Sequence, residues 1–191
     1  MQNSKIRIGF AMCGSFCTMG HAVTALCDMA RHHEIVPIMS ECAYTTDTRF
    51  GRAQDFINAV AEATGKDIIH TVKGAEPIGP KKLLDCLVIA PCTGNTLAKL
   101  AGGITDGAVT MAAKAHLRSG RPLVLAISTN DALSGSAKNI GALMGRRDVY
   151  FVPFSQDDPV EKPRSCIADF SLIEKTVAEA LEGRQLQPIF K

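Results

Sequence analysis

Small polar residues and glycines follow four apolar stretches of the chain, and their chemistry suits an anionic ligand. They are Cys13, Gly14 and Ser15 after residues 6–12, Ser40 after 34–39, Thr93 to Thr96 after 86–90, and Ser128 with Asn130 after 122–127. Gly14 lets a ligand approach the backbone, while Ser15 and Thr18 offer hydroxyls at the start of a predicted helix, where free N–H groups favour a phosphate. The same residue types are ordinary helix caps, so the pattern alone also fits a structural role.

The pattern favours a mononucleotide over NAD. Gly14-Ser15 does not form the glycine-rich dinucleotide fingerprint, and Ser40 stands where that fold places an acidic residue for the ribose. We therefore predict one set of cofactor-contacting residues at the strand ends: Gly14, Ser15, Ser40, Thr93, Gly94, Asn95, Thr96, Ser128 and Asn130.

The cysteines do not predict a metal site. Cys13, Cys17 and His21 are spaced four apart, but Gly14-Ser15 puts Cys13 at a strand end, and no fourth ligand accompanies them. The chain has 7 Cys and no CxxC pair, which indicates that most of them are buried thiols in a reducing cytosol. Cys92 lies in the predicted ligand loop without an activating base, so we expect it to form a wall of the pocket.

The elements that must position these residues alternate between strands and helices. Apolar runs predict strands at residues 6–12, 34–39, 67–72, 86–90, 122–127 and 149–152, and helical spacing predicts helices at 20–32, 47–64, 96–101, 108–117, 139–144 and 168–181. Strands that are apolar on both faces indicate a parallel sheet between helical layers. We expect a three-layer, doubly wound, mostly parallel α/β fold of the Rossmann-like or flavodoxin-like kind, as a single domain over residues 1–191.

One stretch of the chain fits neither the strand pattern nor the helix pattern. Residues 153–165 hold three prolines and several charges, and we expect an irregular lid, a binding loop or a disordered segment there.

Composition narrows the function classes. The chain has 191 residues, 46% of them hydrophobic and 21% charged, which is typical of a globular protein. A net charge of +2 without a basic run, and the absence of Trp, argue against nucleic-acid binding. The polar start, residues 1–5, and the lack of a long apolar run predict a cytoplasmic protein without signal peptide or membrane helix.

The segment Ala90-Pro91-Cys92-Thr93-Gly94-Asn95-Thr96-Leu97-Ala98-Lys99 resembles the A-P-x-x-A-N-T-x-x-K signature of the homo-oligomeric flavin-containing cysteine decarboxylases. Gly94 replaces the usual Ala. The loop Gly14-Ser15 and Asn130 match, in order, the FMN-contacting positions of that family. The resemblance covers about the first two-thirds of the chain, and implies FMN as cofactor and a trimer-based homo-oligomer.

A second resemblance runs through nearly the whole chain. Segments at residues 48–51, 74–80, 128–133, 150–154 and 185–188 resemble the family of dipicolinate synthase B subunits. It implies oxidation of a dihydro- or tetrahydrodipicolinate-type intermediate, or its open precursor, to pyridine-2,6-dicarboxylate in the mother cell of a sporulating bacterium. It also implies a partner, the A subunit of the synthase, which carries NADP.

Two hypotheses follow for this chain's own role. In the first, it completes the active site, with or without FMN, and Arg49 binds a substrate carboxylate, with Lys162 and Arg164 as further candidates; all three also fit solvated surface charges. In the second hypothesis, the chain is a non-catalytic scaffolding subunit, and the absence of the family's catalytic histidine favours this hypothesis. The decarboxylases carry a catalytic His shortly before the strand leading into the signature loop, whereas residues 74–85 contain none and His70 lies further upstream. The same absence disfavours a decarboxylase of the phosphopantothenoylcysteine type, and no catalytic residue is assigned.

Overall fold

Five parallel strands form the centre of the molecule. In the computed structural model, which describes residues 5–191, they are β1 (Arg7–Met12), β2 (Glu34–Met39), β3 (Cys86–Cys92), β4 (Leu123–Thr129) and β5 (Val149–Phe151), in the spatial order β2-β1-β3-β4 with β5 also pairing with β4. Nearly every residue of β1, β3 and β4 is buried. These apolar runs are therefore the buried strands of the predicted mostly parallel sheet.

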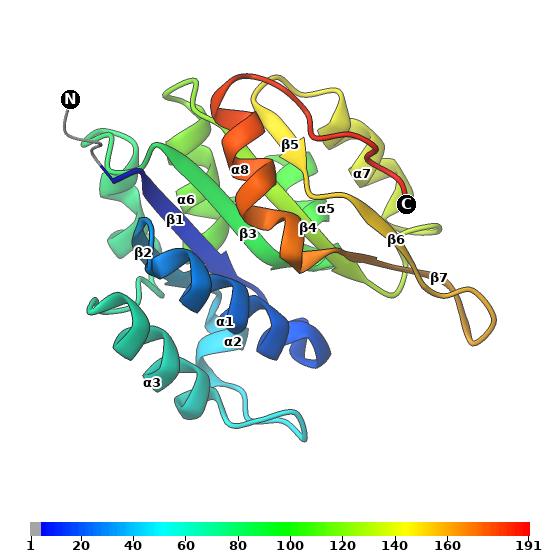
Figure 1. Cartoon of the computed structure of the whole chain (residues 1–191), viewed down its shortest axis with the longest axis horizontal. Coiled ribbons are helices and arrows are strands. Elements are labelled where there is room, and N and C mark those ends of the chain that lie inside the picture. Colours follow the sequence, from blue (N-terminus) through cyan, green and yellow to red (C-terminus); the bar gives the residue numbers. More distant parts are fainter. Residues whose placement is uncertain (1–4) are drawn as a thin grey trace.

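Helices cover both faces of this sheet, which confirms the three-layer arrangement. One face carries α1 (Phe16–Ala30) and α8 (Ile173–Leu181), with α3 (Ala53–Thr64) packed beside α1 (Figure 1). The opposite face carries α4 (Val72–Ala75), α5 (Gly94–Gly102), α6 (Ala108–Leu117) and α7 (Ala137–Met144). The elements α2 (Glu41–Thr45), η1 (Glu76–Ile78) and η2 (Phe170–Leu172) are short connecting helices.

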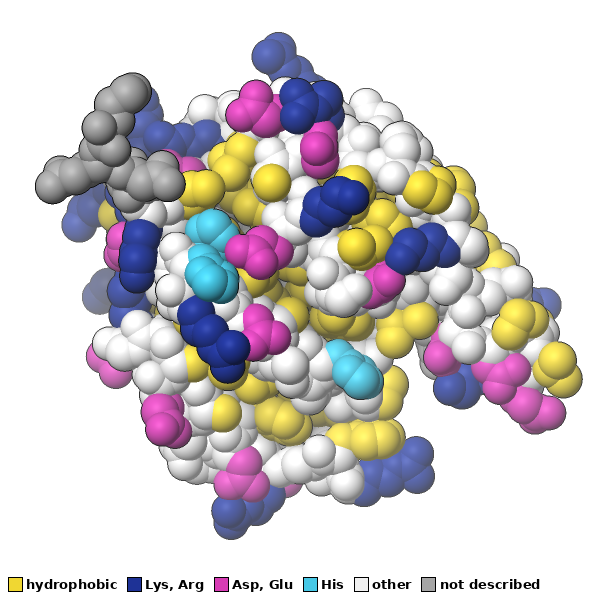
Figure 2. All heavy atoms as spheres, viewed as in Figure 1, with side chains coloured by type: hydrophobic (Ala, Val, Ile, Leu, Met, Phe, Trp, Pro, Cys, Tyr) yellow, Lys and Arg dark blue, Asp and Glu magenta, His cyan; other side chains and the backbone are white. Residues whose placement is uncertain are grey.

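The expectation of an irregular stretch at residues 153–165 is wrong. Strands β6 (Phe154–Asp158) and β7 (Lys162–Ala168) form an antiparallel hairpin, and β7 pairs with the end of β4 through Ser128–Ile167 and Thr129–Cys166. The hairpin projects from the body of the molecule (Figures 1 and 2). Most side chains from Gln156 to Arg164 are exposed, so this hairpin lacks the apolar run that identified the other strands.

Several predicted boundaries also move. The helix expected at residues 47–64 begins only at Ala53, because the chain first turns tightly between Thr48 and Gly51, each donating its N–H to the other's carbonyl at 3.0 and 3.1 Å. The strand expected at 67–72 is a single bridge between Ile38 and Ile69. The helix expected from 168 begins after β7 and η2, at Ile173.

The surface over α1 and α8 carries charges of both signs interspersed with apolar side chains (Figure 2). Within residues 5–191, no helix combines the length and the hydrophobicity needed to cross a membrane. The polar start on which the expected absence of a signal peptide rests falls on residues 1–5, of which residues 1–4 lie outside the described part.

Candidate functional site

Three hydroxyls from two strand ends meet at the start of α1. The Ser15 and Ser128 Oγ atoms are 2.8 Å apart, and Thr18 Oγ1 lies 3.0 Å from each of them. Ser15 precedes α1, yet its side chain makes no capping bond to that helix. The three hydroxyls therefore form hydrogen bonds with one another next to the N-terminus of α1. At this position their O–H groups can rotate to donate to a bound anion.

A second group of contacts joins β1 to β3. Thr96 Oγ1 donates to the buried Cys13 Sγ at 3.2 Å, and Thr93 accepts a capping bond from the Thr96 N–H at 3.3 Å. Strand β1 lies between β2 and β3, so the chain order of the sheet reverses here, and ligands of open α/β sheets bind outside such a point. The ligand loop predicted after residues 86–90 begins later than expected, because Pro91 and Cys92 still belong to β3. The register of β3 with β4 shifts between Ile89 and Cys92.

A third group, centred on Asp131, was not predicted as part of the site. Asp131 Oδ1 accepts hydrogen bonds from Thr129 Oγ1 at 2.6 Å and from Ser136 Oγ at 2.8 Å, and these bonds hold the pKa of the carboxyl below its usual value. Gly94, the first residue of α5, lies against all three side chains. Asp131 directly follows Asn130, so its place next to a predicted ligand contact was the available signal.

The two predicted carboxamides lie on either side of this group. Asn95 follows Gly94 in the first turn of α5, and Asn130 follows Thr129 at the end of β4; both side chains are exposed. Within residues 5–191, neither amide side chain forms a hydrogen bond with the protein. Both are therefore free to bind a ligand outside the strand ends.

The structure places Gly14 beside Ser15 at the end of β1, and Ser40 at the same edge of the sheet, one strand further out at the end of β2. Ser40 Oγ caps α2 by accepting from the Ala43 N–H at 3.2 Å, and the Ser40 N–H donates to the Met12 carbonyl at 2.9 Å. A methyl group on Gly14 would lie 3.1 Å from Cys42 Sγ, so α2 forms a wall beside this glycine. All nine predicted cofactor residues thus lie at the carboxyl ends of β2, β1, β3 and β4.

The cationic candidates lie further from this centre. Arg49 is exposed in the turn between α2 and α3, not at the start of a helix as expected, and its guanidinium carbon is 4.8 Å from the centre of the Phe50 ring. Lys162 pairs with Asp157 at 2.8 Å, while Arg164 is exposed on β7. The structure brings Lys162 and Arg164 together on the hairpin and leaves Arg49 on a separate turn.

The segment without the decarboxylase histidine forms α4, η1 and the turn before β3, packed on α6. His70 lies just ahead of it, exposed and stacked on the Tyr44 ring with a centroid distance of 4.0 Å. It therefore stands beside α2, beyond the bridge that Ile69 forms with β2.

Burial keeps the nearby thiols protonated. Desolvation raises the pKa of Cys13 to about 11 although the Thr96 hydroxyl bond opposes it, and burial also raises the pKa of Cys92. Since the thiolate is the nucleophile, neither group is suited to covalent chemistry at neutral pH.

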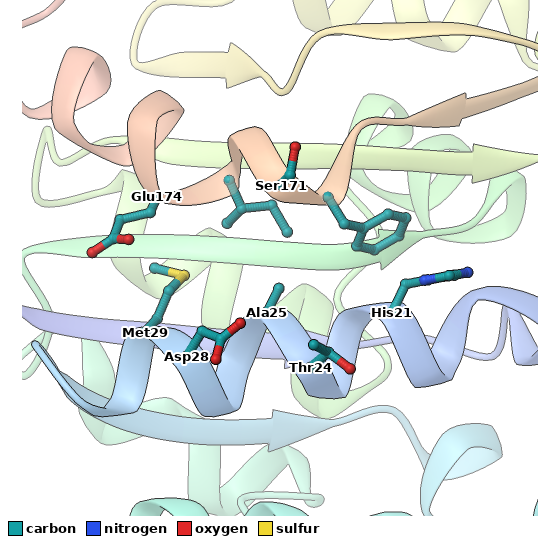
Figure 3. Close-up of a pocket in the computed structure, with 9 residues that line it drawn as sticks. His21, Thr24, Ala25, Asp28, Met29, Ser171 and Glu174 are labelled. Carbon is teal, nitrogen blue, oxygen red and sulfur yellow. The ribbon is translucent and has the colours of Figure 1, made fainter.

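A pocket of about 370 Å³ lies elsewhere, between α1 and α8 (Figure 3). Its two carboxylates already have partners in the protein, since Asp28 pairs with Arg31 at 3.4 Å and Glu174 Oε1 lies 2.9 Å from His33 Nε2. None of the predicted site residues lines it. The strand ends, not this pocket, combine free polar groups with a helix start.

Comparisons with known proteins identify the family to which the chain belongs. The family model described as Flavoprotein matches residues 1–179. The dipicolinate synthase B subunit of Bacillus subtilis (strain 168) is 44% identical over 184 residues, which cover 96% of this chain and 92% of that protein. The crystal structure of the dipicolinate synthase B subunit from Bacillus halodurans C has a TM-score of 0.89 at 41% identity, covering 97% of this chain and 96% of that one. The FMN-dependent cysteine decarboxylase SpaF has a TM-score of 0.65 at 23% identity, covering 92% and 97%, which shows a shared fold.

Proposed function

The chain belongs to the flavoprotein family, in the group that contains the B subunit of dipicolinate synthase, and we propose that it acts as such a B subunit. The reaction oxidises a dihydro- or tetrahydrodipicolinate-type intermediate to pyridine-2,6-dicarboxylate during sporulation, in the mother-cell cytoplasm. Aromatising the dihydro ring removes a hydride and a proton. The observation that carries this proposal is the 44% identity along 96% of the chain.

FMN is the cofactor that the site fits best. The hydroxyls of Ser15, Thr18 and Ser128 lie within 3.0 Å of one another beside the N-terminus of α1, and they suit the phosphate of a mononucleotide. Gly14 keeps the backbone clear in front of them. Asn95 and Asn130 offer free carboxamides for the polar edge of a ring system. When bound, a flavin supplies a two-electron acceptor.

Substrate recognition requires cations, because the substrate carries two carboxylates. Arg49 is the preferred candidate, since a guanidinium binds a carboxylate through two parallel hydrogen bonds. Its turn is held by the paired N–H···O bonds between Thr48 and Gly51, so the side chain projects from a rigid base. Lys162 is less suited because Asp157 already neutralises it.

The partner is the A subunit of the synthase, with NADP as its electron acceptor, and the chain itself assembles into trimer-based homo-oligomers. In the proposed division of work, this chain binds, orients and shields the substrate or flavin at its strand ends, and the partner carries the nicotinamide.

A second candidate function is that of a non-catalytic scaffolding subunit. The observation that favours it is the stretch from Gly74 to Asp85, which holds no His. The same stretch argues against an FMN-dependent decarboxylase of the phosphopantothenoylcysteine type, because the expected proton-transfer residue is missing.

Dipicolinate formation tests the proposal. The A subunit, this chain and the two together are supplied with the dihydro precursor and NADP, and the aromatic product is followed by its ultraviolet absorbance. We expect product above background only from the mixture, and a Ser128→Ala chain to support a lower rate. If the A subunit turned over by itself at a rate that this chain does not change, the proposal would be contradicted. An equal rate with wild-type chain and with Ser128→Ala would support the scaffolding role.

A further inference from the structure

The glycine that interrupts the decarboxylase-like signature is required for space. A methyl group on Gly94 would lie 2.7 Å from Ser136 Oγ, 2.7 Å from Thr129 Oγ1 and 2.8 Å from Asp131 Oδ1. Gly94 does not have a positive φ, so its backbone conformation does not demand glycine. An alanine at this position therefore cannot coexist with the three oxygens where they stand.

Asp131 holds those oxygens in place. Its Oδ1 accepts from the hydroxyls of Thr129 and Ser136, and its backbone carbonyl accepts from the N–H groups of Ser134 and Ser136 at 3.0 and 3.1 Å. The Ser136 side chain is 2% exposed, so its hydroxyl has no alternative partner in water. One carboxylate thus connects the end of β4, the following turn and the start of α7.

The same turn is also fixed from the hairpin. The Leu133 N–H donates to the Arg164 carbonyl at 3.1 Å, and Ser165 Oγ donates to the Thr129 carbonyl at 3.4 Å. The backbone on both sides of Asn130 is therefore restrained. Asn95 directly follows Gly94, so the contact between Gly94 and the Asp131 group lies between the two asparagines. The contact between Gly94 and the Asp131 group sets how far apart these two asparagines are.

We propose that Asp131 is a positioning residue, which locks the turn carrying Asn130 against the start of the helix carrying Asn95, and that Gly94 is the glycine that this lock requires. The inference rests on the proposed FMN site and deepens it: the spacing of the two carboxamides is a property of the Asp131 group. In a preorganised site, displacing a contacting group by about 1 Å lowers the reaction rate on the order of a hundredfold.

The test combines Asp131→Ala, Asp131→Asn, Gly94→Ala and the double variant Gly94→Ala/Asp131→Ala. Asparagine keeps an oxygen that accepts from both hydroxyls, so it is the conservative replacement. Gly141→Ala is the matched control, because a methyl group at that helical glycine meets nothing within 4 Å. For each variant, the denaturant midpoint is measured on the flavin-free protein, and FMN affinity and the positions of the bound flavin bands are measured by titration.

We expect Asp131→Ala to weaken FMN binding by about tenfold or more and to shift the flavin bands, and Asp131→Asn to stay within about threefold of the wild type. We expect Gly94→Ala to lower the denaturant midpoint, and the double variant to lose less stability than the sum of its singles, because the methyl group fills the vacated space.

Two results would overturn the inference. One is unchanged FMN affinity and spectrum in Asp131→Ala, and the other is strict additivity of the Gly94 and Asp131 effects on stability. A wild-type chain that binds no FMN would refute the proposed FMN site and the ligand-positioning part together, while the B-subunit role would still be decided by the dipicolinate assay. The stability cycle would still decide whether Gly94 and Asp131 are coupled, so the two failures are distinguishable.

Discussion

Ser128 is one of two buried residues, with Thr18, among the three hydroxyl-bearing residues at the start of α1; it is 6% exposed and bonded to Ser15 and Thr18. We predict that Ser128→Ala weakens FMN binding by about tenfold or more, since a hydrogen bond to a charged group contributes about 1.5–3 kcal/mol. Unfolding stability should fall by only about 1 kcal/mol, because Ser15 and Thr18 still bond to each other. Ser119→Ala, at the opposite edge of the sheet, is the control, and equal FMN affinity in the two variants would exclude a phosphate site here.

His116 makes stability depend on pH. Burial lowers its pKa to about 4 from 6.5, although the Pro122 carbonyl, 3.0 Å from Nε2, opposes the shift. Above pH 6.5 the ring is neutral in both the folded and the unfolded chain. As the pH falls from 6.5 to 4, only the unfolded chain takes up the proton, so the folded state loses up to about 3 kcal/mol of stability.

We predict that His116→Gln makes the unfolding free energy less dependent on pH over that interval, measured by denaturant titration at several pH values. The exposed His32→Gln serves as the control and should retain the wild-type slope. An unchanged slope in His116→Gln would show that another group carries the dependence.

Arg49 is predicted to act on substrate alone. Arg49→Ala should raise KM by about tenfold to a hundredfold in the assay with the partner, because a charge-assisted hydrogen bond is lost, and should leave FMN retention unchanged. Arg31→Ala is the control, at an exposed arginine that directly follows α1. A wild-type KM in Arg49→Ala would identify the guanidinium as a surface charge stacked on Phe50.

At the scale of elements, one side chain completes the edge of strand β5. Gln185 accepts from the Phe151 N–H at 2.8 Å and donates to the Phe151 carbonyl at 2.7 Å, as a neighbouring strand would. Gln185→Ala leaves both groups of a residue that is 1% exposed without these partners. We predict a loss of about 2 kcal/mol in unfolding stability, against a loss within about 0.5 kcal/mol for the exposed Gln156→Ala.

The elements that could be predicted from sequence are those whose identity depends on local apolar pattern. The parallel strands are recognisable as apolar runs because both of their faces are covered, and the helix predicted at residues 108–117 has the bounds of α6. The hairpin of β6 and β7 was missed because most of its exposed residues are charged or polar and its prolines suggest a loop. Its apolar end, Cys166 to Ala168, pairs with β6 and β4 instead of starting the next helix.

The location of the site could be predicted from the sequence, but its hydrogen-bond network could not. Because carboxyl ends of parallel strands meet at one edge, Ser15 and Ser128 could be placed together although 113 positions separate them. The role of Asp131 could not be predicted, since it depends on the distance of its carboxylate from Gly94, on another strand end. The Gly94 replacement was visible in the sequence, but its cause lies in that tertiary contact.

At the scale of the whole molecule, the sheet brings four strand ends to one edge, so a bound ligand is held by segments from both halves of the chain. Ligand binding should therefore stabilise the fold as a unit. With free FMN at a hundred times its dissociation constant, we predict a gain of about 2.7 kcal/mol and a rise in Tm of about 5–10 °C. Riboflavin, which lacks the phosphate, should give a clearly smaller rise, and equal shifts with the two compounds would argue against the phosphate contact.

The most direct test of the flavin site is the absorbance spectrum of the purified chain after incubation with excess FMN and removal of the free flavin. We predict that the wild-type chain retains the flavin bands and that replacing Asn95 with alanine removes them. A folded wild-type chain that stays colourless would contradict the FMN site at these strand ends, and would leave the proposed role of supporting a partner subunit without a flavin.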